Sequence, residues 1–260
     1  MGDKIVGTLP KTARWKSVID LLDDSPQLTG SLAAAITDAA DYRLKQLKSD
    51  EAVAYAFWLL TRIASASRGG DFSEELTKLG LNAAAGTSML AFVSDLSDKV
   101  RQRTSAQIAA GDFAEISSQA VRAALLETVA LQGHSLFGTR LEDLQGALRS
   151  YSAPDRFSLV AERFFAAFFT RTLRSALDRQ IAQHIGPGNR ISSIAESNEF
   201  GEQLDRYTRQ SARVTRVFAS EWYSLRNWKS GHRISHDEAR GFVAHALDKL
   251  RGAFTEGRLA

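Results

Sequence analysis

The sequence predicts an all-α protein, a single multi-helix bundle of about nine or ten helices with two long helices in its C-terminal part. Three observations support this prediction. Apolar residues recur three and four positions apart in almost every segment, which is the spacing of one helix face. The alternation of apolar and polar residues that is typical of strands is almost absent. Glycine, proline and capping residues interrupt the apolar pattern at intervals that fit helices of ordinary length.

In the first half of the chain, polar residues mark where helices begin and glycines mark where they end. Asp50 is expected to cap a helix that the glycine pair at 69–70 terminates. Asp71 and Glu74 have the spacing of a capping box at the start of a short helix. The helices expected here span residues 15–22, 32–47, 51–68, 71–80, 88–100 and 116–131.

The second half is expected to contain longer helices. Thr139 with Glu142, and Ser235 with Glu238, have the spacing of capping boxes. Pro154 stands where proline is tolerated, in the first turn of a helix. The helices expected here span residues 141–148, 154–185 and 194–228, followed by a last helix from about residue 236.

The helix expected at 154–185 is the most apolar of all. Its phenylalanines cover too wide an arc for one neighbouring helix, so we expect it to lie at the centre of the bundle. They are Phe157, Phe164, Phe165, Phe168 and Phe169. We expect a flexible tail at residues 1–10 and one helical domain at 11–260, with a possible subdivision near residue 150 where glycine, serine and proline gather.

Composition narrows the class of protein. Hydrophobic residues make up 44% and charged residues 24%, which is ordinary for a folded globular chain. The chain has no cysteine, which excludes disulfides and thiolate chemistry and favours a reducing, cytoplasmic location. The first residues lack the apolar core of a signal peptide, and the apolar stretch at 159–170 is too short to span a membrane. We therefore expect no membrane association.

No catalytic or metal-binding motif is found. His232 and His236 have the spacing of two ligands on a helix face, but the capping box of Ser235 and Glu238 places His232 before the helix. The small-residue segments at 83–89 and 67–72 do not match a phosphate-binding loop. We therefore expect no enzyme activity, no cofactor and no metal, although catalytic groups could still converge from distant helices.

A stripe of arginines is the strongest binding signal. Arg206, Arg209, Arg213 and Arg216 follow a spacing of three, four and three residues, so all four share one face of the helix at 194–228. Guanidinium groups in such a row bind phosphates or carboxylates. The alternatives are an ordinary solvated face, an acidic protein surface as partner, or a nucleic acid.

A solvated stripe would be balanced by acidic residues of the same helix. Glu202, Asp205 and Glu221 are placed to do so. Among the binding alternatives we favour a protein partner, because the aromatic residues and Leu225 are expected on the core side, where they cannot stack on bases. Those core-side residues are Tyr207, Val214, Phe218, Trp222 and Leu225.

Several segments between residue 1 and about residue 185 share loose patterns of apolar residues and glycines with a known family. The segments are the opening Met1-Gly2, PKTARWKSVIDLL at 10–22, FSEELTKLGLNAAAGTS at 72–88, VRAALLETVALQ at 121–132 and LVAERFFAAFFTRTL at 159–173. In these segments the chain resembles the QatB-type component of bacterial Qat anti-phage defence systems.

This resemblance implies a subunit of a defence complex that acts beside an ATPase, a QueC-like enzyme and a nuclease. It also implies that the N-terminal glycine, here Gly2, is exposed when the methionine is removed and is then modified by the QueC-like partner. The chain continues with Asp3 and Lys4 after Gly2, whereas the family has an opening of the Gly-Thr-Ser type.

Overall fold

The computed structural model describes residues 45, 47–48, 50–82, 87–105, 113–129, 141–181 and 194–256. Within these residues the chain forms helices and no strand, which confirms the all-α prediction for this part. The helices are α3 (Glu51–Ala66), α4 (Phe72–Lys78), α5 (Met89–Ser105), α6 (Phe113–Thr128), α7 (Leu141–Arg149), α8 (Pro154–Ile181), α9 (Ile194–Lys229) and α10 (His236–Glu256). The tail at 1–10 and most of the helices expected at 15–47 lie outside the described residues, so the total number of helices stays a prediction.

Local capping explains where α3 and α4 begin. The Asp50 side chain accepts hydrogen bonds from the backbone N–H groups of Ala52 (2.9 Å) and Val53 (3.2 Å), which confirms it as the N-cap of α3. A short helix begins directly after Asp71, as expected, but the Asp71 side chain makes no capping hydrogen bond, so the capping-box contact itself is not formed. Glu74 pairs instead with Lys78 one turn later, at 2.7 Å.

The capping box at the start of α10 is confirmed. Ser235 Oγ accepts from the Glu238 backbone N–H at 3.2 Å, and Glu238 Oε2 accepts from the Ser235 backbone N–H at 2.9 Å. This second hydrogen bond is the main reason that the pKa of Glu238 lies below its usual range. The box fixes the point where the chain leaves the turn after α9 and enters α10.

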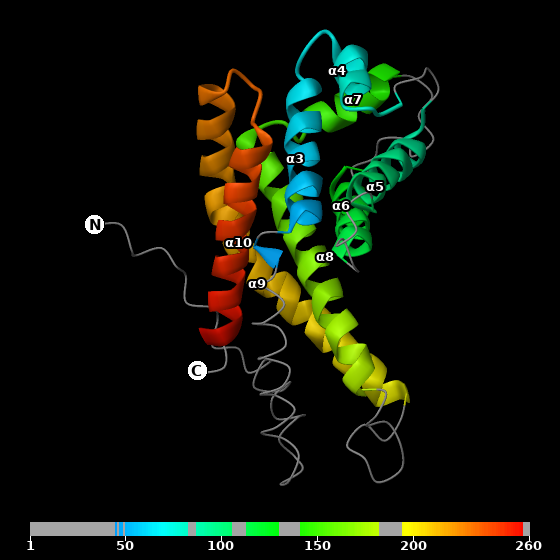
Figure 1. Ribbon diagram of the computed structural model, residues 1–260, viewed down its shortest axis with the longest axis vertical. Coiled ribbons are helices and arrows are strands. Elements are labelled where there is room, and N and C mark those ends of the chain that lie inside the picture. The colour runs from blue at the N-terminus through cyan, green and yellow to red at the C-terminus, as the bar shows by residue number, and fades with distance from the viewer. Residues whose placement is uncertain are drawn as a thin grey trace, which may run out of the picture.

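Helix α8 crosses the middle of the described part, with α5 and α6 on one side and α3 and α10 on the other (Figure 1). It begins at Pro154, as expected, and packs along α9 and α6. Its five phenylalanines at 157, 164, 165, 168 and 169 are at most 1% exposed. The central position predicted for this segment is therefore confirmed for the described residues.

The ring of Phe57 joins four helices. From α3 it contacts Phe165 of α8 at a ring-centroid distance of 5.4 Å, Trp222 of α9 at 5.9 Å and Phe242 of α10 at 5.0 Å. Phe157 and Phe164 of α8 lie within the same range. Aromatic pairs at these distances stabilise a core beyond the area they bury. Phe57 is thus the point where α3, α8, α9 and α10 meet.

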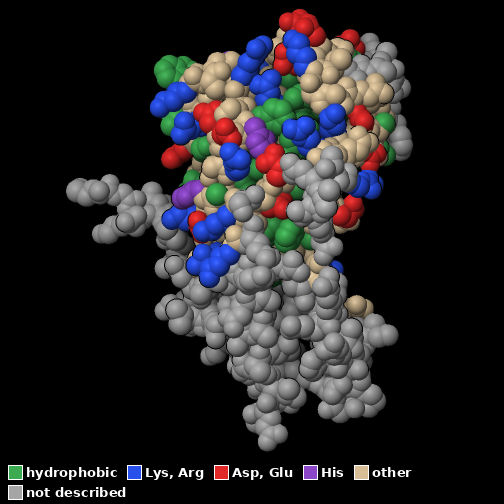
Figure 2. All heavy atoms as spheres, in the orientation of Figure 1, with side chains coloured by type: hydrophobic (Ala, Val, Ile, Leu, Met, Phe, Trp, Pro, Cys, Tyr) green, Lys and Arg blue, Asp and Glu red, His purple; other side chains and the backbone are tan. Residues whose placement is uncertain are grey.

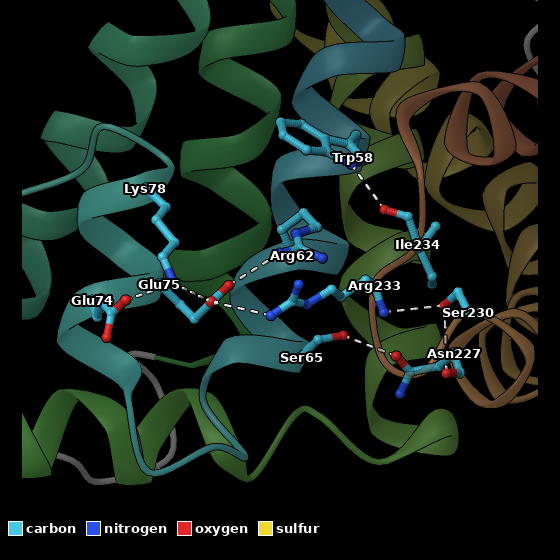
Figure 3. A network of polar contacts seen from close by, with 10 residues as sticks. All are labelled: Trp58, Arg62, Ser65, Glu74, Glu75, Lys78, Asn227, Ser230, Arg233 and Ile234. Carbon is cyan, nitrogen blue, oxygen red and sulfur yellow. Dashed lines mark hydrogen bonds and ion pairs between the residues drawn. The ribbon is translucent and has the colours of Figure 1, made fainter.

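Polar contacts fasten the turn between α9 and α10 to α3 (Figure 3). The Trp58 indole N–H donates to the Ile234 carbonyl oxygen at 3.0 Å, and Ser65 Oγ donates to Asn227 Oδ1 at 3.0 Å. The Asn227 side chain is buried, so leaving it without a partner would be costly. These bonds hold the ends of α9 and α10 against the outer side of α3.

We predict that truncating the α8 core is strongly destabilising. Phe164 and Phe168 are fully buried, so Phe164→Ala and Phe168→Ala should each lower the free energy of unfolding by about 3–5 kcal/mol through lost transfer energy and a new cavity. Chemical denaturation measures this. Val217→Ala, at a side chain that is 58% exposed, is the matched control and should change stability little. Denaturation midpoints of both phenylalanine variants equal to wild type would contradict the placement of α8.

Candidate functional site

The structure places the predicted arginine stripe on the exposed side of α9, but its members differ in what they contact. Arg206 and Arg213 are exposed, and neither has an ion pair with another described residue. Arg209 lies 3.4 Å from Glu127 of α6. Arg216 lies 3.9 Å from Glu162 of α8. Two arginines of the stripe therefore have no ion pair among the described residues, and the other two pair with carboxylates of α6 and α8.

The counter-charges come from other helices than expected. Glu202, Asp205 and Glu221 were expected to balance the stripe, but Asp205 instead pairs with Arg174 of α8. Glu162 is only 8% exposed, and its Oε2 atom makes no hydrogen bond. Arg216 therefore serves as counter-ion to a nearly buried carboxylate, which gives this arginine a role in the fold.

Arg209 belongs to a pocket of about 220 Å³ between α6, α8 and α9, which we call the arginine pocket. Four guanidinium groups and two carboxylates line it, and two alanines with Thr170 complete its wall. The charged residues are Arg163, Arg171, Arg174, Arg209, Glu127 and Asp205.

Arg174 and Asp205 form the tightest pair in this pocket. Arg174 Nε donates to Asp205 Oδ1 at 3.0 Å and Nη2 donates to Oδ2 at 2.8 Å, a two-point contact between α8 and α9. Nη2 also donates to the Gly201 carbonyl oxygen at 3.2 Å. A Cβ atom at Gly201 would lie 3.3 Å from Nη2, so glycine leaves room for this guanidinium.

Arg171 has no carboxylate partner among the described residues. Its Nε donates to Gln119 Oε1 at 3.1 Å, and its Nη1 donates to the Ala167 carbonyl oxygen at 3.2 Å. Burial lowers the pKa of Arg171, while the negative charges of Glu127 and Asp205 act in the opposite direction. A guanidinium stays charged even so. The positive charges of the pocket thus exceed the negative ones by two, a balance that attracts a small oxyanion.

The α8 arginines of this pocket were missed at the level of sequence. Arg163, Arg171 and Arg174 are spaced by eight and three residues, so they share one helix face. The phenylalanines between them dominate the pattern and conceal that spacing. Only the position of α8 beside α9 shows that these arginines meet Arg209.

The outer face of α9 also carries exposed apolar side chains. Trp228 is 77% exposed and Val217 is 58% exposed. Because successive residues of a helix are rotated by 100°, Arg206 and Arg213 lie on the same side of α9 as Trp228 and Val217. We call these four residues the outer face of α9. Hydrophobic side chains protrude over this end of α9 at the upper left of Figure 2.

Leu225 was expected on the core side of α9, and this expectation is wrong, because the side chain is 48% exposed. Phe218 and Trp222 are covered by Phe242 of α10, at ring-centroid distances of 5.5 and 4.3 Å. Further toward the C-terminal end of α9, the neighbouring part of α10 is its first turn, where Glu238 pairs with Arg226. No large apolar side chain of α10 is left there to cover Leu225.

Two further candidates from the sequence are Gly2 and the pair of His232 and His236. Gly2 lies outside the described residues. His236 begins α10 and His232 lies in the preceding turn with φ of 68°, and the described residues contain no cluster of three potential metal ligands. None of the described helices combines the length and the hydropathy needed to cross a membrane. The chain matches no protein-family model, no curated protein sequence and no solved structure.

We predict that sulfate binds in the arginine pocket and stabilises the folded chain, since a ligand of the native state raises the midpoint of thermal unfolding, Tm. Low millimolar sulfate at constant ionic strength should raise the Tm of the wild type. Arg171→Met should remove most of this rise, because it removes the guanidinium that lacks a carboxylate partner. Arg122→Met, at an exposed arginine of α6 outside the pocket, is the control and should keep it. An equal rise in all three proteins would show that sulfate acts without occupying the pocket.

Proposed function

We propose that this protein is a non-catalytic helical interaction subunit that binds another protein through the outer face of α9, with the arginine pocket as a second contact. The exposure of Trp228 carries this proposal. Trp228 is 77% exposed at the end of a long helix and Val217 on the same side is 58% exposed, so a partner that covered them would remove apolar surface from water. Tryptophan and arginine are also the residues that most often dominate binding energy at protein interfaces.

The charges of the same face define the chemistry of the partner. Arg206 and Arg213 are exposed and unpaired among the described residues, so a partner must bring acidic groups opposite them. Trp228 lies 15 residues beyond Arg213, about 22 Å along the helix. The partner we propose therefore presents an apolar pocket for Trp228 and an acidic rim toward the first half of α9.

A second candidate is a helical protein that binds nucleic acid with its arginine stripe. The arginine pocket favours it, because it places three further guanidinium groups beside Arg209 of the stripe, and guanidinium groups fit phosphates as well as carboxylates. The two candidate functions predict a different dependence of the binding affinity on salt concentration. Neutralising a series of phosphates makes affinity fall steeply with salt, whereas a contact centred on Trp228 depends on salt much less.

The resemblance to the QatB-type component supports a more specific proposal. The subunit would belong to a bacterial anti-phage defence system in the cytoplasm, with a QueC-like enzyme among its partners. In this proposal Gly2, freed from the methionine, offers an α-amine that attacks the acyl carbon of an activated substrate held by the partner; an amide bond forms, the activating group leaves with the bonding electrons, and the amine loses a proton.

Intact mass spectrometry tests the role of Gly2. The protein expressed with its genomic neighbours should be heavier than the protein expressed alone, and Gly2→Pro should abolish the difference. Identical masses in both samples, together with full protection against phage by Gly2→Pro, would refute the modification without affecting the proposal for α9.

We predict that the outer face of α9 controls recovery of the partner. Affinity purification from the native host, quantified by mass spectrometry, should recover the partner with the wild type. Trp228→Ala should lower that recovery by about tenfold or more, as expected for a central interface residue. Arg213→Glu should also lower it, by opposing the acidic rim, while the Tm stays close to wild type.

Leu90→Ala is the matched control for this experiment. Leu90 is also an exposed apolar residue, at 38%, but lies on α5. The Leu90→Ala variant should recover as much of the partner as the wild type does. Recovery that is the same for Trp228→Ala, Arg213→Glu and wild type would exclude the outer face of α9 as the interface.

A further inference from the structure

A second concave site lies on the opposite side of α3 from the core. Tyr55 and Trp58 of α3, the turn after α4, the C-terminal half of α5 and the start of α10 enclose a cavity of about 750 Å³. Cavities of about 300–1,000 Å³ are typical of small-molecule sites. Basic side chains gather around hydrophobic surface on the face that Figure 2 shows, where α3, α4 and α10 meet in Figure 1.

Two cations of α5 line this cavity without a carboxylate partner among the described residues. Lys99 and Arg103 are four residues apart, so both lie on the same side of α5, where like charges repel. Arg103 lies 5.7 Å from the centre of the Tyr55 ring. The arrangement concentrates positive charge that an anion would neutralise.

Gly80 makes room for the Lys99 ammonium group. Its backbone is in the left-handed region, with φ of +70°, and a Cβ atom there would lie 2.4 Å from Lys99 Nζ. Any other residue would collide with the amine unless Lys99 moved away. The turn after α4 thus leaves space for the ammonium group at the wall of the cavity.

Of the carboxylates in this region, Glu51 lines the cavity beside His236, and Glu74 and Glu75 pair with other cations. Glu75 lies between Arg62 of α3, Lys78 of α4 and Arg233 of the turn after α9, at 3.1, 3.2 and 3.8 Å (Figure 3). Glu74 also pairs with Lys78, and these contacts raise the pKa of Lys78. Lys78 lines the same cavity, but its charge is balanced.

The opposite wall of the cavity is aromatic and rigid. The Tyr55 and Trp58 rings lie 5.5 Å apart, and His236 packs edge-on against Trp58 at 6.0 Å. The hydrogen bond of Trp58 to the Ile234 carbonyl oxygen holds the indole in place. A wall of this kind takes up the flat, weakly polar part of a ligand.

His236 adds an unsatisfied polar atom to this wall. Its Nε2 is enclosed and makes no hydrogen bond; Glu51 Oε1 lies 3.3 Å away, a contact that is an ion pair only when the imidazole is protonated. A buried nitrogen without a partner is unfavourable, and a ligand group that bonded to it would remove that cost.

We propose that this cavity binds a mononucleotide, with the phosphate on Lys99 and Arg103 and the base beside Trp58 and His236. The cavity is large enough for one nucleotide, the two unpaired cations match one phosphate, and the aromatic wall matches one planar base. This site is separate from the arginine pocket and from the outer face of α9, so it does not depend on the proposed interaction.

Isothermal titration calorimetry of the full chain with AMP, GMP, CMP and UMP tests the proposal. At least one of them should bind at a single saturable site, and the matching nucleoside or inorganic phosphate alone should bind at least about tenfold more weakly. Lys99→Met and Arg103→Met should each weaken nucleotide binding by about tenfold, because each removes a charge-assisted contact to the phosphate.

Arg122→Met is the control, since Arg122 is an exposed arginine of α6 that does not line this cavity. It should bind the nucleotide with an affinity close to wild type. Circular dichroism confirms that each variant is folded. The proposal is overturned if none of the four nucleotides binds in the millimolar range, if the nucleoside binds as well as its nucleotide, or if Lys99→Met and Arg103→Met both bind like wild type.

Discussion

The packing around Phe57 is the contact on which the described structure depends. One fully buried ring of α3 contacts rings from α8, α9 and α10, so these four helices cannot shift independently. Close-packed interiors transmit such constraints, because a displaced ring would overlap its neighbours or leave a void. The outer face of α9, the α8 and α9 sides of the arginine pocket and the aromatic part of the cavity wall lie on helices whose positions this cluster fixes.

The cluster determines which sides of α3 and α9 remain available for binding. Phe57 faces the core, so its neighbours Tyr55 and Trp58 turn toward other sides of α3 and line the cavity. On α9, Trp222 packs into the cluster, which leaves Trp228 and Val217 on the opposite, exposed side. The burial of α8 acts in the same way: its phenylalanines fill the core, and its arginines are left at the boundary with α6 and α9, where they form the arginine pocket.

Local features of the fold could be read from the sequence. Asp50, and the pair of Ser235 and Glu238, cap helices as their spacing indicates, because a cap involves residues within one turn. The burial of Phe164 and Phe168 follows from their density on one segment. By contrast, the exposure of Leu225 depends on where α10 begins, and the apolar periodicity of α9 gives no information about that position.

The candidate sites are less accessible to sequence reasoning. The arginine stripe was found, but its partners Glu127 and Glu162 lie 82 and 54 residues away along the chain, on other helices. The cavity beside α3 collects residues from segments as distant as Tyr55 and His236. Such groupings require the three-dimensional arrangement, because no short motif joins them.

The central claim is that a partner protein covers the outer face of α9, and hydroxyl-radical footprinting tests it most directly. The method compares side-chain oxidation in the free chain and in the complex purified from the native host. The account predicts that oxidation of Trp228 falls several-fold in the complex, while Leu90 on α5 is oxidised equally in both samples. Equal oxidation of Trp228 in the free chain and in the complex would contradict it.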